Sequence, residues 1–88
     1  MSHPYLEVTY RKGKPFAAYL YLDRRPGDKC ARTERHGDML ADVSGDGRLM
    51  GIEFTHIGPV DLQMLNDVLQ RSHQATINAS DLAPLTAA

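Results

Sequence analysis

The 88-residue chain has little of what marks several classes of protein. Its single cysteine, Cys30, can form neither an internal disulfide nor a cysteine zinc cluster, and it fits a reducing cytosol. No apolar run approaches the ~18–20 residues that a membrane span requires. The first residues lack the charged and apolar regions of a signal peptide. We therefore expect a cytoplasmic protein without a membrane segment or a membrane partner.

Neither sign of charge predominates, since ten basic and eleven acidic residues leave a net charge of −1. The charges are nevertheless unevenly spread, with a basic excess in residues 1–36 and an acidic excess in residues 37–88. A basic first half suits a nucleic-acid-binding module that uses Arg11, Lys12, Lys14, Arg32 and Arg35. The sequence pI of about 6.4 argues against this alternative. Basic and acidic strands lying side by side in one sheet are the favoured interpretation.

Five segments have the patterns of β-strands. Residues 5–11 alternate between apolar and polar side chains, and residues 16–22 are apolar on both faces, as in a strand covered on both sides. Residues 30–36 are charged, which is typical of an edge strand protected from aggregation. Residues 39–43 and 49–54 are short strands, joined by an Asp-Gly turn that favours a hairpin.

The hydrophobic period changes after the Gly58-Pro59 pair. Apolar side chains then recur at helical spacing, at Leu62, Leu65, Val68 and Leu69. Pro59 suits the first turn of this helix and Asp61 its positive end, and we expect the helix to end near residues 72–74.

Strands followed by one helix predict an α+β fold. We expect an antiparallel β-meander of four to five strands, with one C-terminal helix packed on one face of the sheet. Residues 1–74 form the single domain. Residues 75–88 are small and polar, and we expect a loose tail unless Ile77, Leu82 and Leu85 pin it to the sheet.

The sharpest motif lies at residues 42–53. Asp42, Ser44, Asp46 and Glu53 stand at the positions that bind calcium in an EF-hand loop, with Gly47 at the position of its sharp turn. An EF-hand needs a helix on each side, whereas both flanks here have strand patterns. A strand also holds Glu53 about 20 Å from the turn. The favoured interpretation is a hairpin turn, and weak calcium binding is the alternative.

No constellation of catalytic residues is visible in the sequence. No pair of the four histidines has the spacing of a metal site, and nothing near Cys30 activates a thiol. We therefore expect neither a cofactor nor enzymatic activity. Tyr19 and Tyr21 are the candidate interaction residues, because they fall on the strand face opposite the predicted helix. A homo-oligomer or a complex with a small protein is the expected assembly.

Two segments resemble a known family. Tyr10 followed by a turn and residues 17–22 (Ala-Ala-Tyr-Leu-Tyr-Leu) is the first, and residues 42–54, with Gly-Ile-Glu after an acidic turn, are the second. Together they are similar to a small bacterial domain of unknown function, the 2283 family of that series. The resemblance spans about residues 5–56 and implies a small antiparallel sheet domain without established enzyme activity. It also implies an antitoxin-like partner in a two-component module.

The chain departs from the family pattern at two positions. Arg11 and Phe16 stand where the family usually has acidic residues. Any role that those acids have in the family does not carry over to this chain. The predicted helix and the tail lie beyond the matching segments.

Overall fold

The computed structural model describes residues 4–56 and 58–86 as five strands, two helices and a 3₁₀ turn. No helix within those residues has both the length and the apolar character needed to cross a membrane. The elements are β1 (Tyr5–Arg11), β2 (Lys14–Tyr21), β3 (Cys30–His36), β4 (Met39–Ser44), β5 (Leu49–Phe54), α1 (Leu62–Arg71), η1 (Ala79–Leu82) and α2 (Ala83–Thr86).

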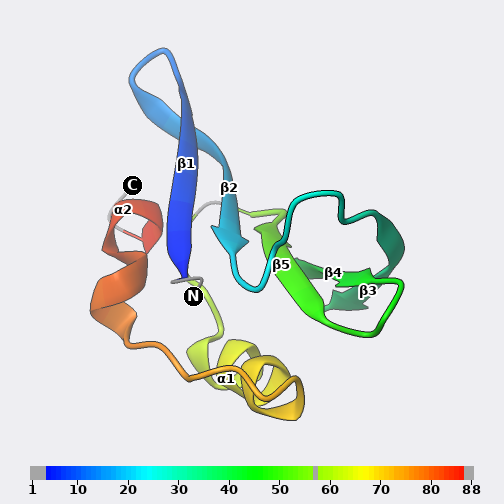
Figure 1. The fold of residues 1–88 in the computed structure, drawn as a ribbon. Coiled ribbons are helices and arrows are strands. Elements are labelled where there is room, and N and C mark those ends of the chain that lie inside the picture. The colour runs from blue at the N-terminus through cyan, green and yellow to red at the C-terminus, as the bar shows by residue number, and fades with distance from the viewer. Residues whose placement is uncertain (1–3, 57, 87–88) are drawn as a thin grey trace.

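The strands form one antiparallel sheet in the order β1-β2-β5-β4-β3 (Figure 1). The predicted α+β class and the predicted edge position of residues 30–36 are confirmed. The order differs from a sequential meander because β2 pairs with β5, which places β3 at the far edge. Strand β5 is buried at every position except Glu53, so a central place suits it, whereas the charged β3 suits an edge.

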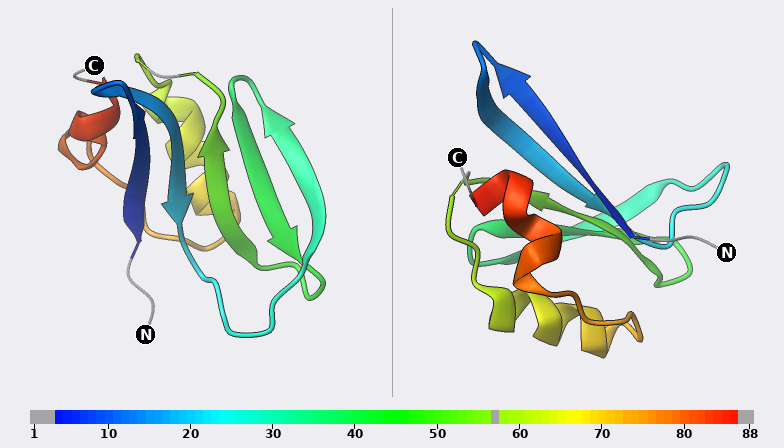
Figure 2. Two further views of the ribbon diagram at one scale, coloured as in Figure 1. Left: turned by 90° about the horizontal axis from the view of Figure 1, so that it is seen from above. Right: turned by 90° about the vertical axis from the view of Figure 1, so that its left-hand side faces the viewer.

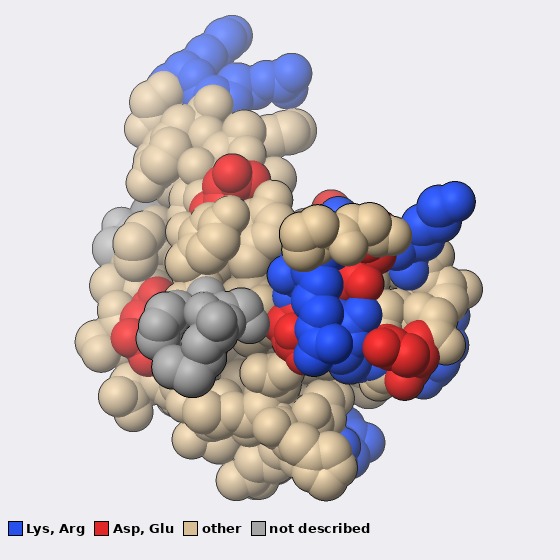
Figure 3. Space-filling view, viewed as in Figure 1, with Lys and Arg blue, Asp and Glu red and all other residues tan. Residues whose placement is uncertain are grey.

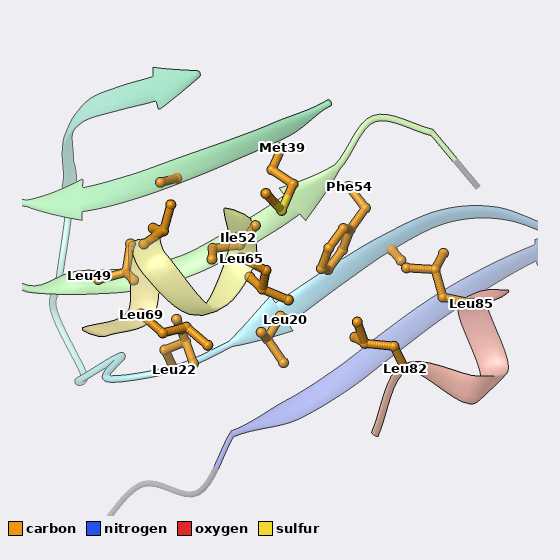
Figure 4. Close-up of a cluster of buried hydrophobic side chains, with 13 residues drawn as sticks. Leu20, Leu22, Met39, Leu49, Ile52, Phe54, Leu65, Leu69, Leu82 and Leu85 are labelled. Atoms are coloured by element: carbon orange, nitrogen blue, oxygen red, sulfur yellow. The ribbon is translucent and has the colours of Figure 1, made fainter. Parts of the chain in front are cut away.

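One face of the sheet carries the hydrophobic core. Helix α1 and the C-terminal segments lie on the same side of the sheet (Figure 2). The buried side chains of α1 are Leu65, Val68 and Leu69, and they meet strand residues such as Leu20 and Ile52 (Figure 4). The opposite face has no helix over it in the described part of the chain.

The helix begins later than its sequence indicates. Asp61 is extended and caps the helix, since its side chain accepts a hydrogen bond from the Met64 amide at 3.0 Å. Pro59 therefore precedes the helix instead of lying in its first turn. The apolar stripe of α1 and its end at Arg71 lie close to the positions predicted.

The C-terminal segment is packed, and the expectation of a loose tail is corrected. Leu82 and Leu85 are buried in the same cluster as the α1 leucines (Figure 4). Asn66 of α1 makes two hydrogen bonds to the Ile77 backbone, at 2.9 Å to its N–H and 3.1 Å to its carbonyl. The three apolar residues of the tail thus fix its path, because their burial offsets the loss of chain entropy.

The outer half of the β1–β2 hairpin projects from the body as a two-stranded ribbon (Figure 1). Strand β2 pairs with β1 along its whole length, but its described pairing with β5 covers residues 18–21. The register shifts between Thr9 and Tyr10, and Phe16 is 56% exposed. Strand alternation would put Phe16 on the core side with Leu20, but Phe16 lies at the register shift and is exposed instead.

Replacement of a buried tail leucine tests this packing. We expect Leu85→Ala to lower the free energy of unfolding by about 2–4 kcal/mol, because it opens a cavity in the core. Thr76→Ala, at an exposed position before the turn η1, is the matched control and should change stability by less than about 0.5 kcal/mol. Urea unfolding measures both values, and equal effects of the two substitutions would show that the tail is not packed.

Candidate interaction surface

A row of tyrosines lies on the sheet face opposite α1. The rings of Tyr5 and Tyr21 are stacked with centroids 4.7 Å apart and planes at 14°. Tyr19 follows at 4.7 Å from Tyr21, tilted by 56°. The Tyr21 hydroxyl donates to Glu7 at 3.3 Å. Tyr5 is 57% exposed, so the row ends in an accessible aromatic ring at the edge of the sheet.

Tyr19 is held at the other end of this row. Its hydroxyl donates to Asp42 Oδ2 at 2.7 Å, and Thr33 donates to Asp42 Oδ1 at 2.8 Å. Burial and the neighbouring carboxylate both raise the pKa of Tyr19 above its ordinary value, so the phenol stays protonated as a donor. These two bonds connect β2, β4 and β3 across β5. Tyr19 therefore has a structural partner. Tyr21 is half-buried like Tyr19 and packs against the exposed ring of Tyr5.

The crossing of Tyr19 over β5 depends on Gly51. A β-carbon at residue 51 would lie 2.3 Å from a ring carbon of Tyr19 and 2.6 Å from its hydroxyl oxygen. A glycine inside a strand commonly marks such a close approach. A glycine within a strand is visible in the sequence. The residue that approaches it, Tyr19, is not, because Tyr19 belongs to another strand.

The cations of the nucleic-acid alternative fall in two separate places. Arg11, Lys12 and Lys14 lie at the tip of the projecting hairpin, where blue atoms gather without red ones (Figure 3). Arg32 and Arg35 lie on β3, at the opposite edge of the sheet. Their partners Val43 and Leu40 are on opposite faces of β4, so these two arginines also diverge. The structure does not bring the five together.

Of the four residues of the calcium alternative, the structure brings Ser44 and Asp46 into contact but holds Asp42 and Glu53 apart from them. Asp42 bonds Tyr19 and Thr33, while Asp46 accepts from Ser44 and from Arg48 Nε at 2.8 Å. Glu53 pairs across the strands with Leu40, away from the turn. No group of three acidic, histidine or cysteine side chains in the described residues could hold a metal ion. The β4–β5 hairpin accounts for the motif.

Arg48 is a structural residue that sequence reasoning missed. Its guanidinium donates to both carboxylate oxygens of Asp28, at 2.6 and 3.1 Å, and to the Asp23 carbonyl at 3.0 Å. It thus ties the loop between β2 and β3 to the β4–β5 turn. Hydrogen bonds from Arg48 hold the pKa values of Asp28 and Asp46 below their ordinary range. Local sequence patterns do not indicate the contact between Arg48 and Asp28, because the two residues are 20 positions apart.

Strand β1 forms one edge of the sheet and is exposed at five of its seven positions. Within the described residues no strand pairs with its outer side. Tyr5 and Tyr10 are each 57% exposed on this strand. A long edge strand with exposed aromatic residues is a template for pairing with another chain. This edge, together with the adjoining tyrosine row, is the candidate interaction surface.

No family model, curated protein or solved structure matches the chain. The resemblance to the 2283 family, and the antitoxin-like partner that it implies, therefore stay predictions.

A double-mutant cycle tests the crossing of Tyr19 over Gly51. We expect Gly51→Ala to cost about 1–3 kcal/mol of stability, because the new methyl group displaces the phenol from Asp42. In a Tyr19→Ala background the same substitution should cost little, which gives a coupling energy of at least about 1 kcal/mol. Gly45→Ala, where nothing lies within 4 Å, is the control. Additive effects in urea unfolding would contradict the account.

Replacement of Arg48 should change how strongly the stability of the fold depends on acidic pH. Because the pKa values of Asp28 and Asp46 are lowered in the folded state, their contribution is present above about pH 4 and is lost as the pH falls below it. We expect Arg48→Gln to be less stable at pH 7 and to lose less further stability between pH 4 and pH 2. Unfolding curves at several pH values measure this, with Arg35→Gln as the control. Parallel pH profiles for Arg48→Gln and the unmodified protein would refute the arginine's role.

Proposed function

We propose that the protein is a non-enzymatic interaction domain that self-associates through β1, so that two sheets join into one across a two-fold axis. The observation that carries this proposal is the exposed seven-residue edge of β1. Main-chain hydrogen bonds between two such edges supply affinity, and the alternating side chains set the register. The described residues bring no set of ionisable groups into a metal-binding arrangement, and the site proposed here needs none.

The charges of β1 select one register. In an antiparallel pair centred on Thr9, Glu7 of each copy lies opposite Arg11 of the partner subunit. Both positions are exposed and share one face of the strand. Opposite charges at directly paired positions favour the pair, and like charges disfavour it. The strand is therefore complementary to a second copy of itself.

The same register gives the exposed aromatic and basic side chains of the ribbon something to contact. Tyr10 lies opposite Val8 of the partner subunit, and Lys12, in the turn that follows β1, comes near the partner's Leu6. Beside Leu6 is a hollow of about 290 Å³, lined also by Ile77 and Asp81. An ammonium group entering this hollow meets a carboxylate. Near the tip of the hairpin, β1 and β2 pair only with each other in the described structure. Pairing of two copies would give this part of β1 a second neighbouring strand.

The opposite edge, β3, is less suited to pairing. It carries three charges within residues 32–35 and no exposed large hydrophobic side chain. Strand β1 carries two charges in seven residues together with the exposed Tyr5 and Tyr10, so association is less disfavoured there. The two edges of the sheet therefore differ, and one interface leads to a closed dimer.

Charge reversal tests the interface and its register. We expect Glu7→Arg and Arg11→Glu each to raise the dimer dissociation constant about tenfold, because two ion pairs become two repulsions. The variant that carries both substitutions should regain most of the affinity, since the opposite charges again face each other. Sedimentation equilibrium measures the constants, with Arg35→Glu on the β3 edge as the control. Circular dichroism checks that each variant is folded.

Two results would refute the proposal. One is a protein that stays monomeric at several hundred micromolar. The other is a dimer whose dissociation constant is insensitive to both single reversals, which would place the interface away from β1.

A further inference from the structure

The tip of the β1–β2 hairpin carries positive charge without a counter-ion. Its three cations are Arg11, Lys12 and Lys14, and no acidic residue occurs within residues 8–22. The ion pairs of the described residues all involve cations elsewhere in the chain. In Figure 3 blue atoms cover this tip, and red atoms begin only below it. The three charges are therefore available to an anionic partner.

The pI of the whole chain does not describe the electrostatic field at this tip. Exposed charges that are further apart than the screening length, about 10 Å at 0.1 M salt, are largely screened from each other. The acidic excess of the chain lies in residues 37–88, which form β4, β5 and the segments that cover the core. The hairpin tip projects away from that body (Figures 1 and 2). A polyanion that approaches the ribbon therefore meets a positive surface.

Two exposed aromatic rings lie directly behind these cations. Tyr10 is 57% exposed and Phe16 is 56% exposed. The guanidinium carbon of Arg11 lies 4.6 Å from the centre of the Phe16 ring, a cation–π contact that keeps the charge beside the ring. Proteins bind single-stranded nucleic acid with this combination, because bases stack on aromatic rings or guanidinium planes while cations pair with the phosphates.

Lys12 stands at the apex of the hairpin in a conformation that favours other residue types. The turn has two residues, since Arg11 pairs with Lys14, and φ is 53° at Lys12 and 77° at Gly13. Asparagine, aspartate and glycine are the residues that two-residue turns of positive φ prefer at such positions. Lysine there places a charge at the outermost point of the ribbon. A side chain kept at an unfavourable backbone position points to a function for that side chain.

The order of these groups along the ribbon selects the partner. The cations occupy the turn and the pair of positions next to it, whereas Tyr10 and Phe16 lie behind them, toward the body. A membrane needs the reverse order, because the rings must reach the acyl boundary while the cations stay at the headgroups. A duplex hides the faces of its bases, so it offers the rings nothing to stack on.

We propose that the hairpin tip binds single-stranded nucleic acid. Phosphates pair with Arg11, Lys12 and Lys14, and bases stack on the two rings. This binding goes beyond the proposed self-association and competes with it, because residues 10–12 also belong to the dimer interface. A single protomer is therefore the form that binds. Lys14 and Phe16 lie on β2, away from the β1 edge, so their replacement leaves that interface in place.

Titration of the full chain at 50 µM with a ten-nucleotide oligo(dT), followed by amide chemical shifts, tests the site. We expect saturable shifts at Gly13, with a dissociation constant of about 100 µM or below in 50 mM salt, and none at the buried Val68. Three phosphate contacts give a log–log salt slope of about −2, so affinity should fall about twentyfold between 50 and 200 mM salt. Absence of shifts at Gly13, or affinity that does not depend on salt, would overturn the proposal.

Two other polyanions test the choice of partner. A ten-base-pair duplex should bind more weakly than oligo(dT), and so should vesicles of phosphatidylcholine with phosphatidylserine, because neither presents base faces to the rings. Equal or tighter binding of the duplex or of the vesicles would overturn the proposal. A protein that binds oligo(dT) but never dimerises refutes the proposed function alone, and a dimer that gives no shifts at Gly13 refutes this inference alone.

Two substitutions on β2 separate the contribution of charge from that of stacking. We expect Lys14→Gln to reduce the magnitude of the salt slope by about 0.7, and Phe16→Ala to weaken binding at least about fivefold with the slope unchanged. Lys29→Gln, at an exposed lysine in the loop after β2, is the matched control and should change neither quantity. Circular dichroism checks that each variant is folded. An unchanged slope in Lys14→Gln, or a loss below twofold in Phe16→Ala, would overturn the proposal.

Discussion

The sheet of this protein is covered on one face only, and the rest of the structure depends on this constraint. A ten-residue helix and a short tail supply the apolar side chains that cover it. Leu65, Leu69, Leu82 and Leu85 are among the most buried residues, and all four meet the same face of the sheet. Residues 4–56 and 58–86 contain no further helix over the other face. That face must therefore be stable in contact with water or with a partner.

Polar and aromatic contacts hold the uncovered side together. Tyr19 crosses β5 above Gly51 to reach Asp42, and Arg48 ties the long loop after β2 to the turn between β4 and β5. These contacts join strands that lie far apart in the sequence, which the helix does not reach on this side. The exposed large hydrophobic residues of the described chain, Tyr5, Tyr10 and Phe16, all lie on the β1–β2 hairpin. The proposed self-association at β1 therefore uses the edge of the sheet on which these residues lie.

Local patterns predicted most of the elements. Alternation identified the strands, helical spacing identified α1, and the Asp-Gly pair identified the β4–β5 hairpin, so the calcium-like motif was interpreted as a turn. Local sequence patterns do not predict that β2 pairs with β5. This pairing depends on which strand buries the most apolar surface in the assembled sheet. The same limit applies to Arg48 and Asp28, and to Tyr19 and Asp42. The small, polar residues of the tail predict a loose segment. Burial of Leu82 and Leu85 instead determines its path.

The central claim is that β1, and not β3, is the edge at which a second copy adds. Amide hydrogen exchange, measured on the full chain at 5 µM and at 500 µM, tests it most directly. The account predicts that the outward-facing amides of β1 become protected at the higher concentration, while those of β3 exchange at the same rate in both samples. Protection that rises at β3, or rates at β1 that do not depend on concentration, would contradict the account.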